Sequence, residues 1–308
     1  MRIRPVIVLS ALAAAGLVLA GCSGSATPTP SETPTVSADL CDVAAAPGEA
    51  SDSITVKGEF GKEPTVDFTA PLEIASIERT VITEGDGDAI TEGQLVDYAI
   101  TTFDAESGDA LGAQGYTSNK PLPQQVTAAG AGQFFGCATI GSRFVLAVPA
   151  AEGGQALVHV VDVLGVSPAA AWGEPQEPVD GMPEVTLADD GTPTVTIPDT
   201  DAPTELEIAV LKQGDGEKVK DGDYVLTQYT GVSWDTKENF DSSWSRGAPA
   251  PFATNQVYEG FGKALVGQKV GSQVLVVMPP SMGDLSGDLK GQTLVFVIDI
   301  LGTQHADS

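Results

Sequence analysis

The residues best suited to chemistry in this chain lie close together between Val225 and Ser245, in the segment VLTQYTGVSWDTKENFDSSWS. An alternating run leads to Tyr229, a Thr-Gly pair follows, and Phe240 and Asp241 open a second aromatic-bearing segment. Aromatic rings beside a carboxylate suit either an ordinary surface hairpin or one wall of an apolar pocket with a polar rim. The sequence shows no metal-ligand spacing, no phosphate loop and no catalytic Ser or Cys arrangement, so we expect no metal and no cofactor.

The elements that must position these residues are mostly strands. The segments QVLVVMP from Gln273 and LVFVIDILG from Leu294 are rich in β-branched residues and are too short for good helices. One short helix is expected in EGFGKALVGQ from Glu259, weakened by its glycines. A twisted antiparallel sheet with this helix across it would bury the strand residues together with Phe261 and Leu265, which predicts an α+β fold.

An internal repeat predicts the domain organisation. VITEGDGDAITEGQLV from Val81 matches VLKQGDGEKVKDGDYV from Val210 without a gap, at an offset of 129 residues. Further along the chain, LVHVVDVLG from Leu157 matches LVFVIDILG from Leu294. The chain is therefore interpreted as two copies of one domain, joined by a proline-containing, semi-rigid spacer. The expected ranges are a signal peptide at 1–21, a tether at 22–53, the first domain at 54–166, a linker at 167–182, the second domain at 183–303 and a tail at 304–308.

The first 21 residues predict export. Arg2 and Arg4 precede the apolar run VIVLSALAAAGLVLA, and small residues stand directly before Cys22. The ending LAGC resembles the lipobox of bacterial lipoproteins, which implies a lipid anchor on Cys22 and an extracytoplasmic position on the outer face of the cytoplasmic membrane. The alternative is a plain secretory signal that merely contains a cysteine. The Ser/Thr/Pro-rich stretch after Cys22 predicts a tether.

Two further cysteines and the charge complete the composition. Cys41 and Cys137 form an even pair in an oxidising compartment, which predicts a disulfide; the alternative is two separate buried thiols.

The formal net charge of -27 is spread thinly and favours solubility. Because no basic stripe exists to displace counterions from phosphates, nucleic acid is excluded as a partner. We expect a monomer.

The second copy resembles the FKBP-type peptidyl-prolyl cis-trans isomerase family over nearly its whole length. The motifs that carry the resemblance are GDxV, YTG at Tyr229, FDSS at Phe240, VYEGF ending at Phe261, VGQKVGSQ, PP at Pro279 and LVF at Leu294. The resemblance implies two tandem FKBP-like domains, each a twisted antiparallel β-sheet wrapped on one short helix. It also implies catalysis of rotation about Xaa-Pro bonds, which needs neither a nucleophile nor a metal.

The resemblance further implies the site. Its expected catalytic residues are Tyr229, Phe240, Asp241, Tyr258, Phe261 and Phe296. Its expected substrate-binding residues are Arg246, Phe252 and Val257. Tyr258 holds the position whose backbone N–H faces the substrate carbonyl, and Asp241 holds that of a rim carboxylate paired with Arg246. For Phe296 taken alone, an ordinary core role is the alternative.

Two departures from the family pattern bear on turnover. Phe261 stands where the family usually has tryptophan, which implies a larger cavity. The segment SMGDLSGDLKGQT between Pro280 and Leu294 lacks the family's tyrosine and its isoleucine-rich flap. We therefore expect slow turnover or broad specificity.

The first copy is expected to keep the fold and lose the site. The alignment places each pocket residue opposite a different residue type: Ile100 for Tyr229, Leu111 for Phe240, Gly112 for Asp241, Ala131 for Phe261 and His159 for Phe296. His159 is interpreted as a space-filling strand residue, because no second histidine or carboxylate is placed near it by any motif. A Cys41–Cys137 bond would attach the end of the tether to this domain.

The sequence thus predicts a peptidyl-prolyl isomerase of the cell envelope that acts on proline-containing exported polypeptides. The alternative is a non-catalytic holdase or protein-binding lipoprotein that uses a degenerate isomerase fold.

Overall fold

The computed structural model describes residues 39–117, 120–284 and 286–306. The predicted signal peptide at 1–21, the lipobox cysteine Cys22 and the Ser/Thr/Pro-rich stretch after it lie outside the described residues. No helix within the described ranges is both long enough and apolar enough to cross a membrane.

The second half of the chain builds one antiparallel sheet. Its order is β14-β13-β17-β16-β12-β9. β15 pairs with the first residues of β13, and β14 pairs with later residues of the same strand. The strands are β9 (Glu174–Pro175), β12 (Glu207–Gln213), β13 (Tyr224–Ser233), β14 (Asn239–Ser242), β15 (Ala250–Ala253), β16 (Gln273–Met278) and β17 (Leu294–Gln304). The helices are α4 (Glu259–Leu265) and the 3-10 turns η1 (Trp244–Arg246) and η2 (Pro280–Met282).

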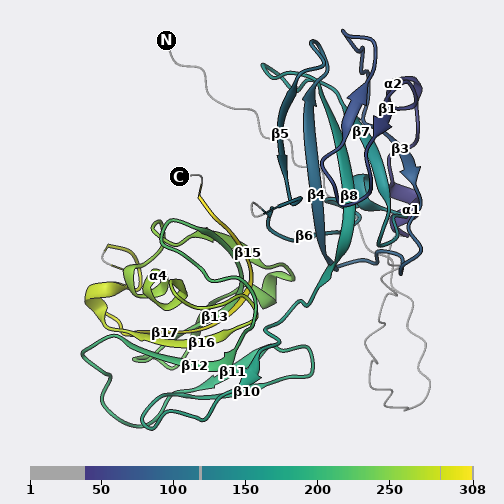
Figure 1. Cartoon of the computed structure of the whole chain (residues 1–308). Helices are drawn as coiled ribbons and strands as arrows, with labels where there is room; N and C mark the ends of the chain where they lie inside the picture. The colour runs from purple at the N-terminus through teal and green to yellow at the C-terminus, as the bar shows by residue number, and fades with distance from the viewer. Residues whose placement is uncertain (1–38, 118–119, 285, 307–308) are drawn as a thin grey trace, which may run out of the picture. The chain divides into compact units, whose positions relative to one another are not determined.

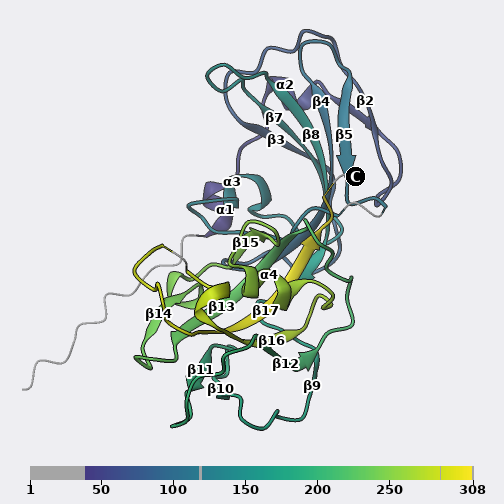
Figure 2. The ribbon, with the colours of Figure 1, turned by 90° about the vertical axis from the view of Figure 1, so that its left-hand side faces the viewer.

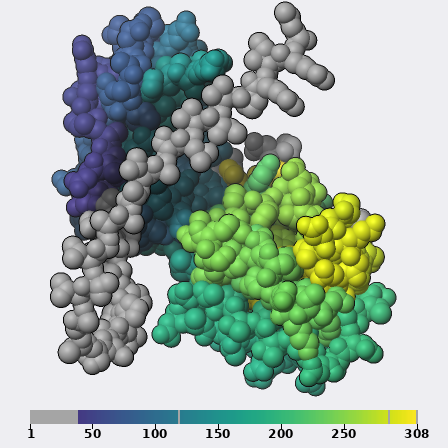
Figure 3. Space-filling view, turned by 180° about the vertical axis from the view of Figure 1, so that it is seen from behind, coloured from purple at the N-terminus to yellow at the C-terminus, as the bar shows by residue number. Residues whose placement is uncertain are grey.

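The two faces of this sheet have different covers. Alternate side chains of a strand point to opposite faces, so Phe296 and Ile298 of β17 pack with α4, whereas Val295 and Val297 belong to the cluster on the other face. A hairpin of β10 (Glu184–Leu187) and β11 (Pro193–Thr196) covers that outer face, on the side opposite α4 (Figures 1 and 2). In Figure 3 the teal-green atoms of this region form the lower side of the green and yellow part.

Trp234 marks the covered outer face. Its side chain is 6% exposed and packs with Ile197, Leu275 and Val277. Its indole N–H donates to the carbonyl of Thr200 at 3.3 Å. The hairpin and the chain that follows it therefore bury apolar surface that the sheet alone would leave in water.

The first half builds a second antiparallel sheet in the same manner. Its order is β3-β7-β8-β4-β5, and β6 pairs with β4. The strands are β3 (Glu78–Thr83), β4 (Leu95–Asp104), β5 (Ala110–Gln114), β6 (Gln124–Gln125), β7 (Arg143–Val148) and β8 (Leu157–Ser167). The one-turn helix α3 (Gly132–Phe135) contributes to the inner cluster, and a hairpin of β1 (Thr55–Lys57) and β2 (Thr65–Asp67) to the outer one. Read from β5 to β3, this order matches that of the other sheet from β14 to β12.

The GDG turns repeated in the two halves have the same packing role. A Cβ atom on Gly85 would lie 2.2 Å from the carbonyl oxygen of Ile140, and one on Gly214 would lie 2.3 Å from that of Val270. Only glycine allows these backbones to approach so closely. The motif therefore serves the fold in both halves.

The predicted tether ends earlier than residue 53. Leu40 and Ala50 are buried, the former in the inner cluster of the first sheet, and they lie in the short helices α1 (Leu40–Val43) and α2 (Glu49–Asp52). Cys41 and Cys137, the predicted pair, are joined by a disulfide with 4.7 Å between their Cα atoms. Residues 40–53 thus belong to the packed structure of the first half.

Part of the predicted linker at 167–182 also belongs to a packed unit. The N–H of Ala171 donates to buried Asp299 at 2.8 Å, and the indole of Trp172 donates to Asp215 at 3.1 Å. The strand β9 then pairs with β12 at the edge of the second sheet. Residues 171–176 are therefore fastened to the second half and do not form a free spacer.

Candidate functional site: an aromatic cavity

The pocket side of the second sheet is set by the register of three strands. Gly231 of β13 pairs with Phe296 of β17 on one side and with Asp241 of β14 on the other. A Cβ atom on Gly231 would lie only 2.7 to 2.9 Å from ring atoms of Phe240 and Phe296. The glycine of the YTG motif therefore makes room for these two rings, whose centroids lie 5.4 Å apart in an edge-to-face arrangement.

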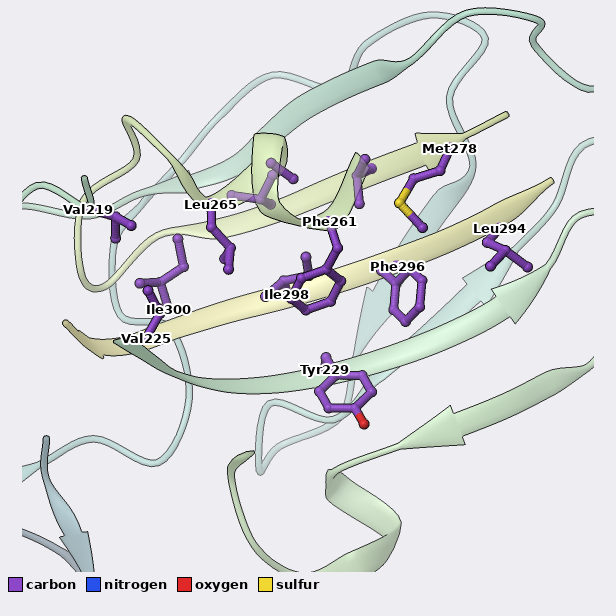
Figure 4. Close-up of a cluster of buried hydrophobic side chains, with 13 residues drawn as sticks. Val219, Val225, Tyr229, Phe261, Leu265, Met278, Leu294, Phe296, Ile298 and Ile300 are labelled. Carbon is purple, nitrogen blue, oxygen red and sulfur yellow. The ribbon is translucent and has the colours of Figure 1, made fainter. Parts of the chain in front are cut away.

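The rings form one continuous cluster over the sheet. Phe261 projects from α4 and meets Phe296 edge to face, with centroids 5.2 Å apart. Tyr229 contacts Phe261 at 6.1 Å and Phe252 at 5.6 Å, also edge to face. Figure 4 shows Phe261 and Phe296 within the buried cluster, whereas the hydroxyl of Tyr229 points away from it. Packing thus fixes the rings, and the phenol oxygen is left for polar contacts.

A cavity of about 680 Å³ opens between these rings and the loops around α4. Its lining comprises Tyr229, Phe240, Asp241, Phe252, Gln256, Val257, Tyr258, Phe261, Leu289 and Phe296. The structure therefore gathers the residues expected from the sequence around one space, except Arg246, which stands beside it. Phe296, at 4% exposed, is both a core residue and part of the cavity wall.

The polar rim is a three-membered network. The hydroxyl of Tyr229 donates to Asp241 at 2.5 Å and accepts from Arg246 at 2.6 Å. Arg246 also forms an ion pair with Asp241, and its guanidinium carbon lies 5.3 Å from the centroid of the Tyr229 ring. Because the side chains of Arg246 and Asp241 are 47% and 40% exposed, solvent screens their attraction. Their main effect is to orient the tyrosine.

The charge state of the rim follows from these contacts. Burial by itself would raise the pKa of Asp241, but hydrogen bonds from Tyr229 and Arg246, with the positive charge of Arg246, outweigh it and hold the pKa below its usual value. Burial, and then the hydrogen bond to Asp241, raise the pKa of Tyr229. At neutral pH the rim is therefore a carboxylate held by a neutral phenol.

The N-terminus of α4 provides a hydrogen-bond donor at the cavity wall. Tyr258 is the residue that precedes the helix and lines the cavity. Within the described residues, its backbone N–H donates to no protein acceptor. The first N–H groups of a helix have no partner within the helix, so this group can bind a carbonyl that enters the cavity.

The segment after β16 supplies a wall residue that the sequence did not predict. The carboxylate of Asp284 accepts from the N–H groups of Ser286 at 3.0 Å, Gly287 at 2.6 Å and Leu289 at 3.3 Å. This turn brings Leu289 to the cavity. The expected flap residues are absent, but an aliphatic side chain occupies part of that side. The only signal for it in the sequence was that Leu289 is one of the few apolar residues of this segment.

Gln256 was also missed. It directly precedes Val257 and lines the cavity. A polar residue in a short loop carries no periodic signal, so only the three-dimensional structure places it at the site.

Across 39–306, apart from 118–119 and 285, no group of His, Cys, Asp and Glu side chains is arranged to hold a metal.

The arrangement can hold a compact apolar ring in a partly dry site and offer one hydrogen bond to a neighbouring carbonyl. The lining contains no nucleophile paired with a base. The site therefore suits a conformational change of a bound group better than a covalent step.

Comparison with known proteins agrees with this geometry. The family model for FKBP-type peptidyl-prolyl cis-trans isomerases matches residues 215–301. A probable FK506-binding protein of Corynebacterium glutamicum is 37% identical over 101 residues, which cover 32% of this chain and 86% of that protein. An FK506-binding protein of Streptomyces anulatus is 34% identical over 105 residues, covering 32% and 85%. The crystal structure of FkpA from Escherichia coli is 28% identical, covers 42% of this chain and 54% of that chain, and has a TM-score of 0.32. Because the chain matches more than four fifths of the length of the Corynebacterium and Streptomyces proteins at over 30% identity, it belongs to the FKBP-type peptidyl-prolyl cis-trans isomerase family.

Proposed function

We propose that the chain is an isomerase anchored outside the cytoplasmic membrane, where it accelerates Xaa-Pro isomerisation in exported polypeptides. The observation that carries the catalytic part is the aromatic cavity with its Tyr229–Asp241–Arg246 rim. The location is supported by the predicted export signal at 1–21 and by the small residues before Cys22. A disulfide between Cys41 and Cys137 suits an oxidising compartment.

The cavity would lower the rotation barrier through its environment. Amide resonance keeps the Xaa-Pro bond planar, with a barrier of about 18 to 20 kcal/mol. The twisted amide is less dipolar than the planar one, so an apolar wall such as that of Phe240, Phe261 and Phe296 favours it. The N–H of Tyr258 can hold the carbonyl of the residue before proline while the bond turns.

The rim would keep the cavity open to the proline ring. Tyr229 is tied at its hydroxyl to Asp241 and Arg246, so its ring cannot rotate into the space beside Phe261. A wall held in place before binding loses less conformational entropy when the substrate enters.

The catalytic proposal is tested by exchange NMR spectroscopy on a peptide that contains Ala-Phe-Pro. We expect the full chain to accelerate cis-trans exchange, and Phe240→Ala and Tyr229→Ala each to lower the catalysed rate by about tenfold or more, or about 1.4 kcal/mol of barrier. Tyr224→Ala is the matched control, because Tyr224 also lies on β13 but is 47% exposed. Equal exchange with and without protein would falsify catalysis.

The location is tested with Cys22→Ser. Wild-type protein is expected in the membrane fraction and open to protease added outside the cell. The variant is expected in the soluble extracytoplasmic fraction. Wild-type protein that resists external protease would overturn the proposed location.

The proposal includes the first half as a degenerate copy of the catalytic half. Its support is the shared strand order and the shared GDG turns. Ile100, Ala131 and His159 replace three aromatic residues of the pocket. Residual catalysis in the Phe240→Ala chain that disappears on mutation of Ile100 would contradict this part.

A further inference from the structure

The first half also holds a cavity on the inner face of its sheet. It measures about 390 Å³, against about 680 Å³ for the cavity of the second half. Among its lining residues are Ile100 of β4, Ala131 and Phe134 at α3, Leu146 of β7 and His159 of β8. Several of these side chains are only partly buried, so the cavity is open to solvent. The sequence predicts a lost site, whereas the structure retains a space with a different lining.

The strand register shows that this space corresponds to the isomerase cavity. In the first sheet Ile100 pairs with Val161, and Thr102 pairs with His159. In the second sheet Tyr229 pairs with Ile298, and Gly231 pairs with Phe296. Ile100 and His159 therefore take the places of Tyr229 and Phe296.

The lining defines the chemistry of a ligand. No Asp, Glu, Lys or Arg side chain contributes to the wall, so a charged ligand would lose its hydration without a partner. The walls are aliphatic or aromatic apart from Gln124, the phenol of Tyr98 and the imidazole of His159. The volume lies at the lower end of the range for small-molecule sites and suits one side chain with its adjoining peptide group.

His159 of β8 places a hydrogen-bonding group at this wall. Its Nδ1 is 2.9 Å from the Oγ1 of Thr102, which fixes the ring. Burial lowers the pKa of His159, so the imidazole is neutral at neutral pH. Within the described residues its Nε2 has no hydrogen-bond partner, which leaves it for a peptide group.

We propose that the cavity of the first half binds an aliphatic side chain of an unfolded polypeptide, and that Nε2 of His159 bonds to the adjoining peptide group. Positions 100, 131 and 159 lack the phenyl and phenol rings that their counterparts in the second half have. The aromatic enclosure that suits proline is therefore absent, and the remaining cavity suits the side chain of leucine, isoleucine or valine. The identity of the occupant as an unfolded polypeptide rests on the proposed function. A second site on one chain raises the local concentration of the client at the isomerase.

The test uses the full chain with 13C-labelled isoleucine and leucine methyl groups. The Ile100 signal is assigned with Ile100→Val. We titrate acetyl-Gly-Leu-Gly-amide, which has no proline, and compare the near-isosteric acetyl-Gly-Asn-Gly-amide. The leucine peptide is expected to shift the Ile100 and Leu146 methyl signals saturably, with a Kd on the order of 1 mM. The asparagine peptide is expected to leave them in place.

Two variants that fill the space give an independent check. Ala131→Phe and His159→Phe introduce the residues of the second half, and each is expected to weaken leucine-peptide binding by about tenfold or more. The remaining methyl signals report whether each variant is folded. Unchanged binding in both folded variants, or equal shifts with the two peptides, overturns the proposal. Shifts produced only by a dodecyl detergent would identify a lipid site and overturn it as well.

The outcome is separable from that of the isomerase proposal. Binding of the proline-free leucine peptide is expected to persist in Phe240→Ala, because that substitution lies in the other half. If Ala-Phe-Pro exchange is not catalysed while leucine binding persists, only the isomerase proposal fails. If exchange is catalysed while the Ile100 signal stays fixed, only the present inference fails.

Discussion

Tyr229 connects the apolar wall of the isomerase cavity with its polar rim. Its ring packs on Phe252 and Phe261, and its hydroxyl bonds to Asp241 and Arg246. The two parts can be separated, because phenylalanine keeps the ring and removes only the oxygen. Ring and hydroxyl then make separate contributions to stability and turnover.

We expect Tyr229→Phe to cost about 1 kcal/mol of unfolding free energy, since Asp241 and Arg246 keep each other and water as partners. Turnover is expected to fall only a few-fold, well short of the loss in Tyr229→Ala. Urea unfolding and exchange NMR measure the two effects. A Phe variant as inactive as the Ala variant would mean that the hydroxyl, and not the ring, carries the function.

The pH dependence follows from the rim. The pKa of Asp241 lies below its ordinary value of 3.8, so its stabilising contribution is present above 3.8 and is lost as the pH falls through the folded value. The pKa of Tyr229 lies above its ordinary value of 10.0, so its contribution is present below 10.0 and is lost as the pH rises through the folded value. Catalysed exchange should therefore be flat between about pH 5 and pH 9.

Asp241→Asn serves as the control for the acidic side. It is expected to lower turnover at pH 7 and to remove the acid-dependent loss. A wild-type midpoint near pH 6.5 would point instead to control by a histidine.

At the scale of elements, the turn of Asp284 with Leu289 decides how the cavity is closed on one side. Asp284 holds the turn through three backbone N–H groups. Those bonds also lower the pKa of Asp284, with the bonds to Ser286 and Gly287 as the largest causes. The turn is therefore maintained at neutral pH, when the carboxylate is ionised.

We expect Asp284→Ala to raise the KM for the Ala-Phe-Pro peptide several-fold and to change kcat little, because Leu289 would lose its fixed position while the aromatic wall stays intact. Asp288→Ala is the matched control, since Asp288 lies in the same segment and is exposed. Saturation kinetics by exchange NMR separate KM from kcat. A fall in kcat alone would place the turn in the rotation step.

The sequence predicts those elements whose side chains follow a period. β16 and β17 are rich in β-branched residues and were both expected as strands, and the glycine-containing α4 was found where the short helix was expected. The family resemblance placed Phe240, Phe261 and Phe296 in one pocket, and the structure brings them together. Most of this site could therefore be predicted from strand alternation and motif spacing.

Elements whose sequence shows no hydrophobic periodicity were not predicted. The hairpin β10–β11 is short and partly exposed, so no hydrophobic pattern marks it as the cover of a sheet face. α1 and α2 have four residues each and depend on burial of Leu40 and Ala50. The position of Leu289 depends on backbone bonds to a side chain five residues earlier, which no sequence rule specifies.

At the scale of the whole molecule, a covalent cross-link distinguishes the first half from the second. The disulfide Cys41–Cys137 lies within the first half and spans 96 residues. In the second half the corresponding position to Cys137 is Gly267, and both residues have positive φ values, 58° and 91°. The cross-link is thus a feature of the half that lacks the isomerase site.

We expect Cys41→Ser with Cys137→Ser to destabilise the first half by about 4 kcal/mol, because a loop of that length gains much entropy in the unfolded chain when it is opened. Exchange of the Ala-Phe-Pro peptide should stay near the wild-type rate. Protease digestion with peptide mapping measures the first effect and exchange NMR the second. Loss of both together would show that the halves unfold as one unit.

Because Trp234 is buried under the hairpin, unfolding of the second half can be followed by tryptophan fluorescence. The three tryptophans of the chain are Trp172, Trp234 and Trp244, so indole emission comes from residues after 171. The far-ultraviolet circular dichroism signal, in contrast, has contributions from the strands of both sheets. One denaturant titration read by both signals would give the second half its own curve, and the difference between the curves would belong to the first.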